Sequence, residues 1–216
     1  MPLTKPKKHF SLEKLGFSPA AETVMLAAVV GVLGGFGALF FKKLIFFMQF
    51  FWWHTPNMRP EVLHAVPWWM RVAVPIAGGL IVGPLIYYFA REAKGHGVPE
   101  VIAAVVTNNS IIRPAVVLVK TFASAISISS GGSVGREGPI VQIGAAIASS
   151  AGQLLRLRPV QMKTIVGCGV AAGIGATFNA PIAGTLFALE LIVSDFGLTS
   201  FTPIIVASVT STGPSW

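Results

Sequence analysis

Charged side chains are scarce in this sequence of 216 residues. Asp, Glu, Lys and Arg together make up 11% of the chain, against 53% hydrophobic residues, and the mean hydropathy is +0.73. A water-soluble domain of this size needs far more polar surface, so the composition excludes that class. Long apolar runs predict an all-α integral membrane protein instead.

Cysteine is rarer still, since Cys168 is the only one and has no partner for an intrachain disulfide. It lies in the apolar, glycine-rich stretch 167–175, and we interpret it as a small packing residue. The formal charge is +8, but no basic run is interleaved with aromatic residues, which excludes nucleic acid as a partner. The sequence also has no metal-ligand spacing, no GxSxG and no nucleophile beside a base. We therefore expect no enzyme, no metal and no other cofactor.

Two long apolar segments predict membrane-crossing helices over residues 19–53 and 67–90. Lysines before the first segment, and basic residues just after the second, predict that the N-terminal segment 1–17 is cytoplasmic. Tryptophans flank the polar loop 54–66, which is typical of a membrane interface and places the loop on the other side. The glycines within residues 31–37 predict close contact with other helices.

Two glycine-rich turns then break the apolar pattern. Residues 95–100 read GHGVPE and precede a helix to about residue 106, which is too short to cross a bilayer. Residues 131–139 read GGSVGREGP and lead into a helix over 137–154. Each helix has a proline in its first turn, and both N-termini are expected to point into the protein. Helix N-termini offer unpaired N–H groups and a positive dipole end, which suit an anion.

The remaining segments also predict helices. One covers residues 114–130, a small-residue-rich one covers 162–178, and another starts at the sequence NAP, 179–181, and is interrupted by Glu190 near its end. A last apolar segment starts near residue 202. The whole pattern is that of tilted and half-spanning membrane helices.

Three sequence blocks, taken together, identify a family resemblance. GHGVPE at 95–100, GREGP followed by VQIG within 135–144, and FNAPIAG at 178–184 occur in this order and at these spacings. The chain resembles, from about residue 18 to its end, the CLC family of voltage-gated-type chloride channels and anion/proton antiporters. The resemblance implies a homodimer in the plasma membrane, with one pore in each subunit. It also implies a CLC-type inverted-repeat transporter fold, of which residues 18–216 are the first transmembrane repeat.

The resemblance assigns the gate and the anion site. Glu137 is implied to be the gating glutamate, which occupies an anion position when closed and is displaced or protonated to admit chloride or a similar small inorganic anion. The implied anion-binding residues come from the two glycine-rich turns: Gly95, His96, Gly97, Val98, Arg136, Glu137 and Gly138. As an alternative, Arg136 and Glu137 pair with other groups and only fix a buried turn.

Two positions depart from the family pattern. Where well-known members carry an anion-coordinating serine, this sequence has His96. The imidazole either faces the anion and makes its occupancy pH-dependent, or turns into the cytoplasmic vestibule as a structural histidine. Many antiporters also carry two consecutive glutamates after the FNAP block, where this chain has Glu190 and Leu191. Leucine relays no proton, which favours a channel, or a proton route that avoids the usual glutamate and for which Glu190 is a weak candidate.

The sequence also contains no counterpart of the family's second inverted repeat. We expect the chain to be a fragment or truncated product of such a transporter, with the association of two copies as the alternative. A membrane fragment of this kind could be nonconducting, because inward-facing polar turns would lack their partners.

Overall fold

The computed structural model describes residues 19–54, 66–89, 97–195 and 197–212. Every regular element in these ranges is helical. The helices are α1 (Pro19–Trp53), α3 (Trp68–Phe89), α4 (Val98–Thr107), α5 (Pro114–Ser129), α6 (Glu137–Leu154), α7 (Pro159–Phe178), α8 (Pro181–Phe187), the π-helix η3 (Ala188–Val193) and α9 (Leu198–Thr212). The predicted all-α membrane fold is confirmed. The predicted segment 1–17, with Gly95 and His96, lies outside the described residues.

The core is built around α7. This helix packs against α1, α6, α8 and α9, and its middle is almost wholly buried. Gly169 and Gly144 face each other where α7 meets α6, and a Cβ on either would overlap the other's carbonyl oxygen. Cys168 is fully buried and free, so its interpretation as a packing residue is confirmed. The backbones therefore approach closely where the sequence supplies small residues.

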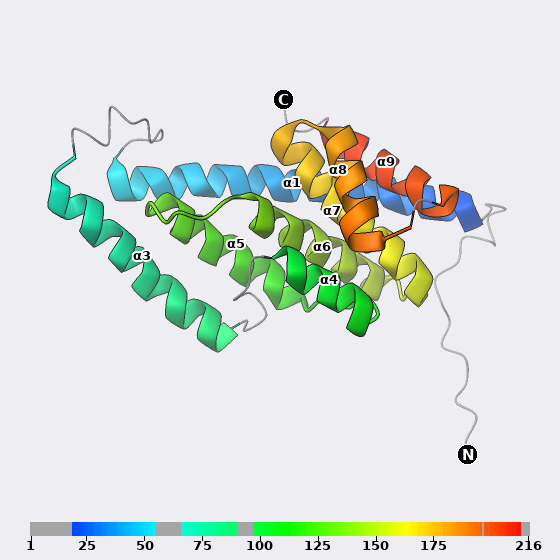
Figure 1. Ribbon diagram of the computed structural model, residues 1–216, viewed down its shortest axis with the longest axis horizontal. Coiled ribbons are helices and arrows are strands. Elements are labelled where there is room, and N and C mark those ends of the chain that lie inside the picture. The colour runs from blue at the N-terminus through cyan, green and yellow to red at the C-terminus, as the bar shows by residue number, and fades with distance from the viewer. Residues whose placement is uncertain (1–18, 55–65, 90–96, 196, 213–216) are drawn as a thin grey trace, which may run out of the picture.

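The first helix, α1, runs along the length of the molecule (Figure 1). It is one of two described helices that are long and apolar enough to cross a membrane. Its glycines contact other helices as predicted: Gly31 and Gly35 face α9, and Gly34 faces Ala172 of α7. Small residues thus hold a long apolar helix against the core, while some of its large side chains, such as Phe36 and Phe47, stay exposed.

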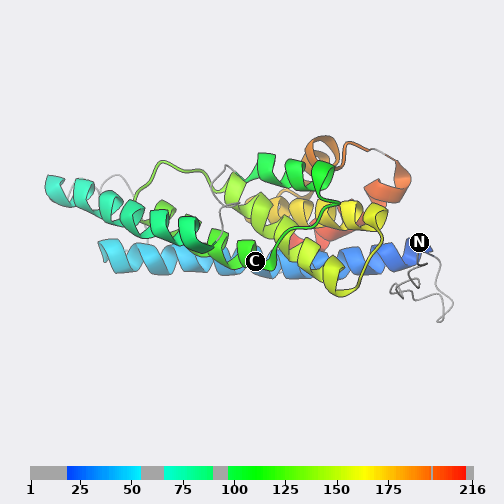
Figure 2. The same ribbon diagram turned by 90° about the horizontal axis from the view of Figure 1, so that it is seen from below.

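The second helix of membrane-crossing length, α3, stands away from the core. It packs mainly against α5 and exposes apolar side chains along its length, with Trp68 77% and Leu80 70% exposed. Figures 1 and 2 show it diverging from the rest of the bundle, and they place α4 and α1 on opposite sides of α6. In a membrane protein, such a surface is compatible with lipid contact.

Helix boundaries agree with the predictions except near two prolines. The structure begins α7 at Pro159, where residue 162 was predicted, because proline's fixed φ suits the first helical position. The last helix begins at Leu198, not near residue 202, and Pro203 lies inside it. Gly197 starts α9, since its carbonyl accepts hydrogen bonds from the N–H groups of Ser200 and Phe201. The interruption predicted at Glu190 is the π-helix η3.

Candidate functional site

The first glycines of the stretch 131–139 end a helix. Gly131 has φ +98°, and the Gly132 N–H donates to the Ser127 carbonyl at 2.9 Å, a hydrogen bond that closes the last turn of α5. A residue in this left-handed region is most often glycine, which has no Cβ to strain. The stretch therefore divides into a cap for α5 and a separate start for α6.

The second half of the stretch forms the start of α6. Arg136 precedes the helix, and its carbonyl accepts the first helical hydrogen bond from the Ile140 N–H at 3.1 Å. Pro139 has no N–H, and those of Glu137 and Gly138 find no acceptor among the described residues. The Glu137 side chain is exposed, and its carboxylate bends back over Gly135, where a Cβ would collide with it. The helix thus starts with free N–H groups beside its own carboxylate.

The turn before α4 is built around Gly97. Gly97 has φ +101° and ψ −50°, and its N–H donates to the Glu100 carboxylate at 2.7 Å. Glu100 lies in the first turn of α4, so its side chain caps its own helix. This bond occupies the Gly97 N–H. The next backbone donor along the turn is therefore the Val98 N–H.

The two turns meet. A Cβ on Gly97 would overlap the carbonyl group of Gly138, so the backbones of the α4 turn and the first turn of α6 are in direct contact. Residues about 40 apart in the sequence, predicted to form one site, are thereby adjacent. Gly95 and His96, the remaining predicted members on the α4 side, lie outside the described residues.

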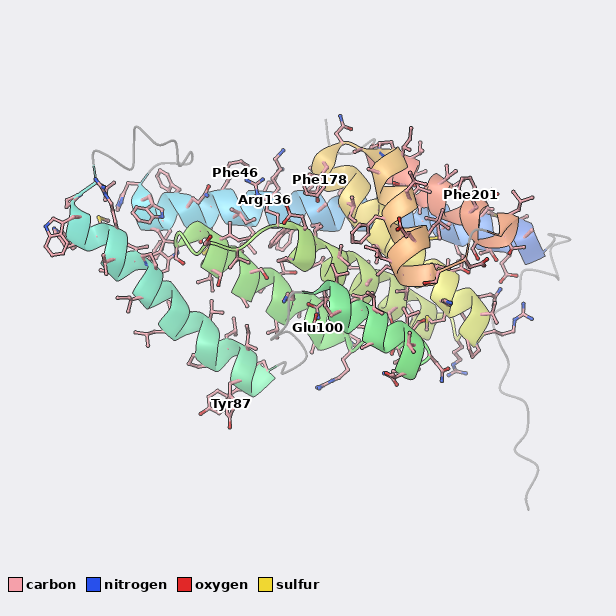
Figure 3. The ribbon with its side chains drawn as sticks, viewed as in Figure 1. Phe46, Tyr87, Glu100, Arg136, Phe178 and Phe201 are labelled. Atoms are coloured by element: carbon pink, nitrogen blue, oxygen red, sulfur yellow. The ribbon has the colours of Figure 1, made fainter. Side chains whose placement is uncertain are left out.

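The Arg136 side chain lies elsewhere. It lines a cavity formed with α1 and the end of α7, and Figure 3 shows it beside α1, apart from Glu100 on α4. Neither Arg136 nor Glu137 makes an ion pair or a side-chain hydrogen bond with any residue that the structure describes. The alternative in which these two charges pair to fix a buried turn therefore gains no support from the described contacts.

The proposed proton-path candidate lies on η3. Glu190 is exposed, and Leu191 beside it is 42% exposed. The Ser194 hydroxyl donates to the Glu190 carbonyl at 3.4 Å, so the recorded contact involves the Glu190 backbone and not its carboxylate. π-Helical turns occur frequently at functional sites, and this one packs against α4 as well as α7.

One positioning contact was missed by sequence reasoning. The indole N–H of Trp53 donates to the Ser129 carbonyl at 2.8 Å, in a buried position, and its ring lies against Gly131. This bond ties the end of α1 to the end of α5, just before the stretch that leads to Glu137. The sequence marks Trp53 only as part of an interfacial tryptophan pair, because the partner is 76 residues away.

Comparison with known proteins points to one family. The family model described as "Voltage gated chloride channel" matches residues 78–216. A putative chloride channel protein ClcB-like of Ralstonia nicotianae is 33% identical over 86% of this chain and 44% of its own length. The H(+)/Cl(-) exchange transporter ClcA of Vibrio vulnificus is 32% identical over 89% of this chain and 42% of its own length.

Solved structures show the same fold. A CLC-type fluoride/proton antiporter aligns with a TM-score of 0.74 at 28% identity, covering 95% of this chain and 47% of that one. A slow cyanobacterial Cl-/H+ antiporter aligns with a TM-score of 0.72 at 21% identity, covering 92% of this chain and 47% of that one. The chain spans less than half the length of these relatives.

Proposed function

Because this chain belongs to the voltage-gated chloride channel family, we propose that it supplies one side of a transmembrane pathway for chloride or a similar small inorganic anion, gated by Glu137. In this proposal, Val98, Glu137 and Gly138 contribute the surface on which the anion rests. Arg136 adds positive field from behind the start of α6, and Gly97 sets the separation of the two turns.

The contact between Gly97 and Gly138 carries the proposal. It brings the N-terminal turns of two helices together, and their unpaired N–H groups and dipoles attract the same negative charge. Irregular backbone at membrane depth is stable where it lines a polar pathway. An anion between these turns would occupy donors that have no acceptor among the described residues.

Glu137 suits a gate because its carboxylate competes with the transported anion for the positive N-terminus of α6. It is the first residue of α6, so its ionised carboxylate lies beside the positive end of the helix dipole. Protonation removes that negative charge and thereby the competitor, and an anion then gains the position. This mechanism predicts that flux depends on the charge of one side chain.

Anion efflux from liposomes tests the proposal. We expect the reconstituted chain to pass chloride, and Glu137→Gln to change the rate and to reduce its pH dependence. Asp195→Asn is the matched control, because Asp195 is an exposed carboxylate in the turn before α9, outside the proposed pathway. Unchanged efflux in Glu137→Gln would reject Glu137 as the gate. Failure to pass chloride, fluoride or nitrate would favour the alternative, a nonconducting membrane fragment.

Proton coupling is the second candidate. It is favoured by the 28% identity to a solved fluoride/proton antiporter and the 32% identity to an H(+)/Cl(-) exchange transporter. Leu191 argues against the usual internal route, so coupled transport here would need another path, with Glu190 the candidate. Proton uptake under a chloride or fluoride gradient distinguishes a coupled antiporter from a channel. Uptake in a fixed ratio to anion movement would establish coupling, and proton uptake that does not respond to the anion gradient would establish a channel.

The same proposal extends to the setting of the chain. We propose a homodimer in the plasma membrane, residues 18–216 as one transmembrane repeat, and a cytoplasmic segment 1–17. The basic residues before α1 and the tryptophans at its far end support this orientation.

A further inference from the structure

A small cavity lies on the far side of α6 from the α4 turn. Its volume is about 40 Å³, and it is lined by α1, the residue that precedes α6, and the end of α7. Its polar lining consists of Lys42 and Gln49 from α1, Arg136, and Thr177 from α7. Phe46 and Ala176 are among its apolar walls. The volume accommodates a few waters or one small polar group.

The cavity is positively charged. Lys42 and Arg136 both line it, and no acidic side chain does so among the described residues. Neither cation has an ion pair or a side-chain hydrogen bond within the described part of the chain. Two cations beside one cavity repel each other, and an anion between them would relieve that repulsion.

The other lining groups are hydrogen-bond donors suited to an oxyanion. The Thr177 hydroxyl is buried and has no hydrogen-bond partner among the described residues. Gln49 adds an amide, and the planar Arg136 guanidinium offers the paired N–H groups that match two oxygens of a phosphate. Buried hydroxyls are normally satisfied, so the orphaned one indicates a missing partner in this cavity.

The position along α1 points to the membrane interface. From Val24 to Phe41 the helix is uncharged, and 18 residues of α-helix span about 27 Å, close to the hydrocarbon thickness. Lys42 therefore lies at the headgroup boundary. On the hydrocarbon side of Lys42, Phe36 and Phe40 are 58% and 55% exposed, an apolar surface that acyl chains would cover. Basic pockets between membrane helices recognise lipid phosphates in this way.

We propose that this cavity binds a phosphate group, supplied by an anionic phospholipid whose chains lie along α1. Lys42 and Arg136 neutralise the charge, and the Thr177 hydroxyl donates to a phosphate oxygen. This binding does not depend on the anion pathway. One consequence rests on the proposed function: a phosphate held by Arg136 places negative charge beside Glu137 and slows anion entry.

Lipid binding to the purified chain tests the proposal directly. The protein is placed in phosphatidylcholine nanodiscs, and binding of a fluorescent phosphatidylglycerol is measured by energy transfer. We expect Lys42→Gln to weaken binding about tenfold, the loss of one charge-assisted interaction. Lys43→Gln is the matched control, because Lys43 is the adjacent exposed lysine and does not line the cavity.

A second variant separates binding from folding. Thr177→Val keeps the side-chain shape but removes the hydroxyl, so we expect severalfold weaker phosphatidylglycerol binding with unchanged or higher thermal stability. Competition by millimolar inorganic phosphate would show that the phosphate itself is recognised, whereas competition only by phosphatidylglycerol assigns recognition to the intact lipid. Equal binding by Lys42→Gln and Lys43→Gln, or no preference over phosphatidylcholine, would overturn the proposal.

The effect of the bound lipid on transport is tested separately, by chloride efflux. Phosphatidylglycerol should reduce chloride efflux in the wild type and in Lys43→Gln, and not in Lys42→Gln. Binding with no effect on efflux would refute the coupling alone. A chain that binds lipid but passes no anion would refute the proposed function and leave the lipid site standing.

Discussion

The spacing of the two glycine-rich turns depends on one missing side chain. Gly97 adopts φ +101°, and its α-carbon faces the Gly138 carbonyl with no room for a Cβ. Both the backbone conformation and the contact therefore require glycine at this position. The distance between the α4 and α6 N-termini, and with it the width of the proposed anion site, depends on Gly97.

Gly97→Ala should destabilise the chain and impair transport. We expect a loss of at least about 1 to 2 kcal/mol from the left-handed backbone alone, with a further loss from overlap with Gly138. Thermal unfolding in detergent and chloride efflux measure the two effects. Gly79→Ala in α3 is the control, because an added Cβ there meets no atom within 4 Å. Equal unfolding temperatures for the two variants would contradict the contact.

Residue types in the site were predictable, but side-chain directions were not. Gly97, Glu137 and Gly138 stand out because glycine and charge interrupt apolar sequence, and the backbones of Gly97 and Gly138 are in contact. The hydrogen bond from the Gly97 N–H to Glu100 is local, since the two residues are three apart, whereas the turning of Arg136 toward α1 depends on packing with an element distant in sequence. Local patterns carry no information on such contacts.

At the scale of elements, prolines and glycines fixed most helix boundaries. The ends of α1 and α6 coincide with the predictions, because breakers mark them in the sequence. The predicted start of the last helix, near residue 202, was wrong, because the turn at Asp195 and Gly197 starts α9 earlier, at Leu198. A side-chain cap is a weaker sequence signal than a proline.

The Trp53 hydrogen bond should stabilise the junction of α1 and α5. Trp53→Phe keeps an aromatic ring but leaves the buried Ser129 carbonyl without its donor, and we expect a loss of about 1 to 3 kcal/mol. Trp52→Phe is a close control, since the Trp52 indole nitrogen is buried and has no hydrogen-bond partner among the described residues. Thermal unfolding of both variants is the measurement. A larger loss in Trp52→Phe would refute the assigned role of Trp53.

The start of α9 should be sensitive to acid. The Gly197 N–H and the Ser200 hydroxyl both donate to the Asp195 carboxylate, and these bonds lower its pKa below the ordinary range. A lowered pKa means that the stabilisation is present above the ordinary carboxyl value of about 4 and is lost as the pH falls through the lower folded value. Hydrogen exchange in the first turn of α9 should therefore accelerate on acidification. Asp195→Asn should remove this pH dependence, and an unchanged profile would contradict the cap.

At the scale of the whole molecule, composition predicted the membrane class and the family resemblance predicted the arrangement. Periodicity alone does not show that α7 lies at the centre, since α3 is as apolar as α7 yet mostly exposed. The small residues of α7 let four helices approach it, whereas α3 packs mainly against α5 and leaves even Gly79 and Gly83 with no other atom near the position of a Cβ. Hydropathy therefore does not separate the core helix from the peripheral one here.

The orientation of α1 gives a prediction for the entire chain. A helix of 35 residues is about 52 Å long and crosses the bilayer even when tilted, so its two ends should lie on opposite sides. We expect His54→Cys to react with a membrane-impermeant maleimide on intact cells, and Ala20→Cys only after permeabilisation. The wild type is the blank, since Cys168 is its only cysteine and is fully buried. Labelling of both positions from the outside would refute a single crossing by α1, and labelling of Ala20→Cys alone would invert the proposed topology.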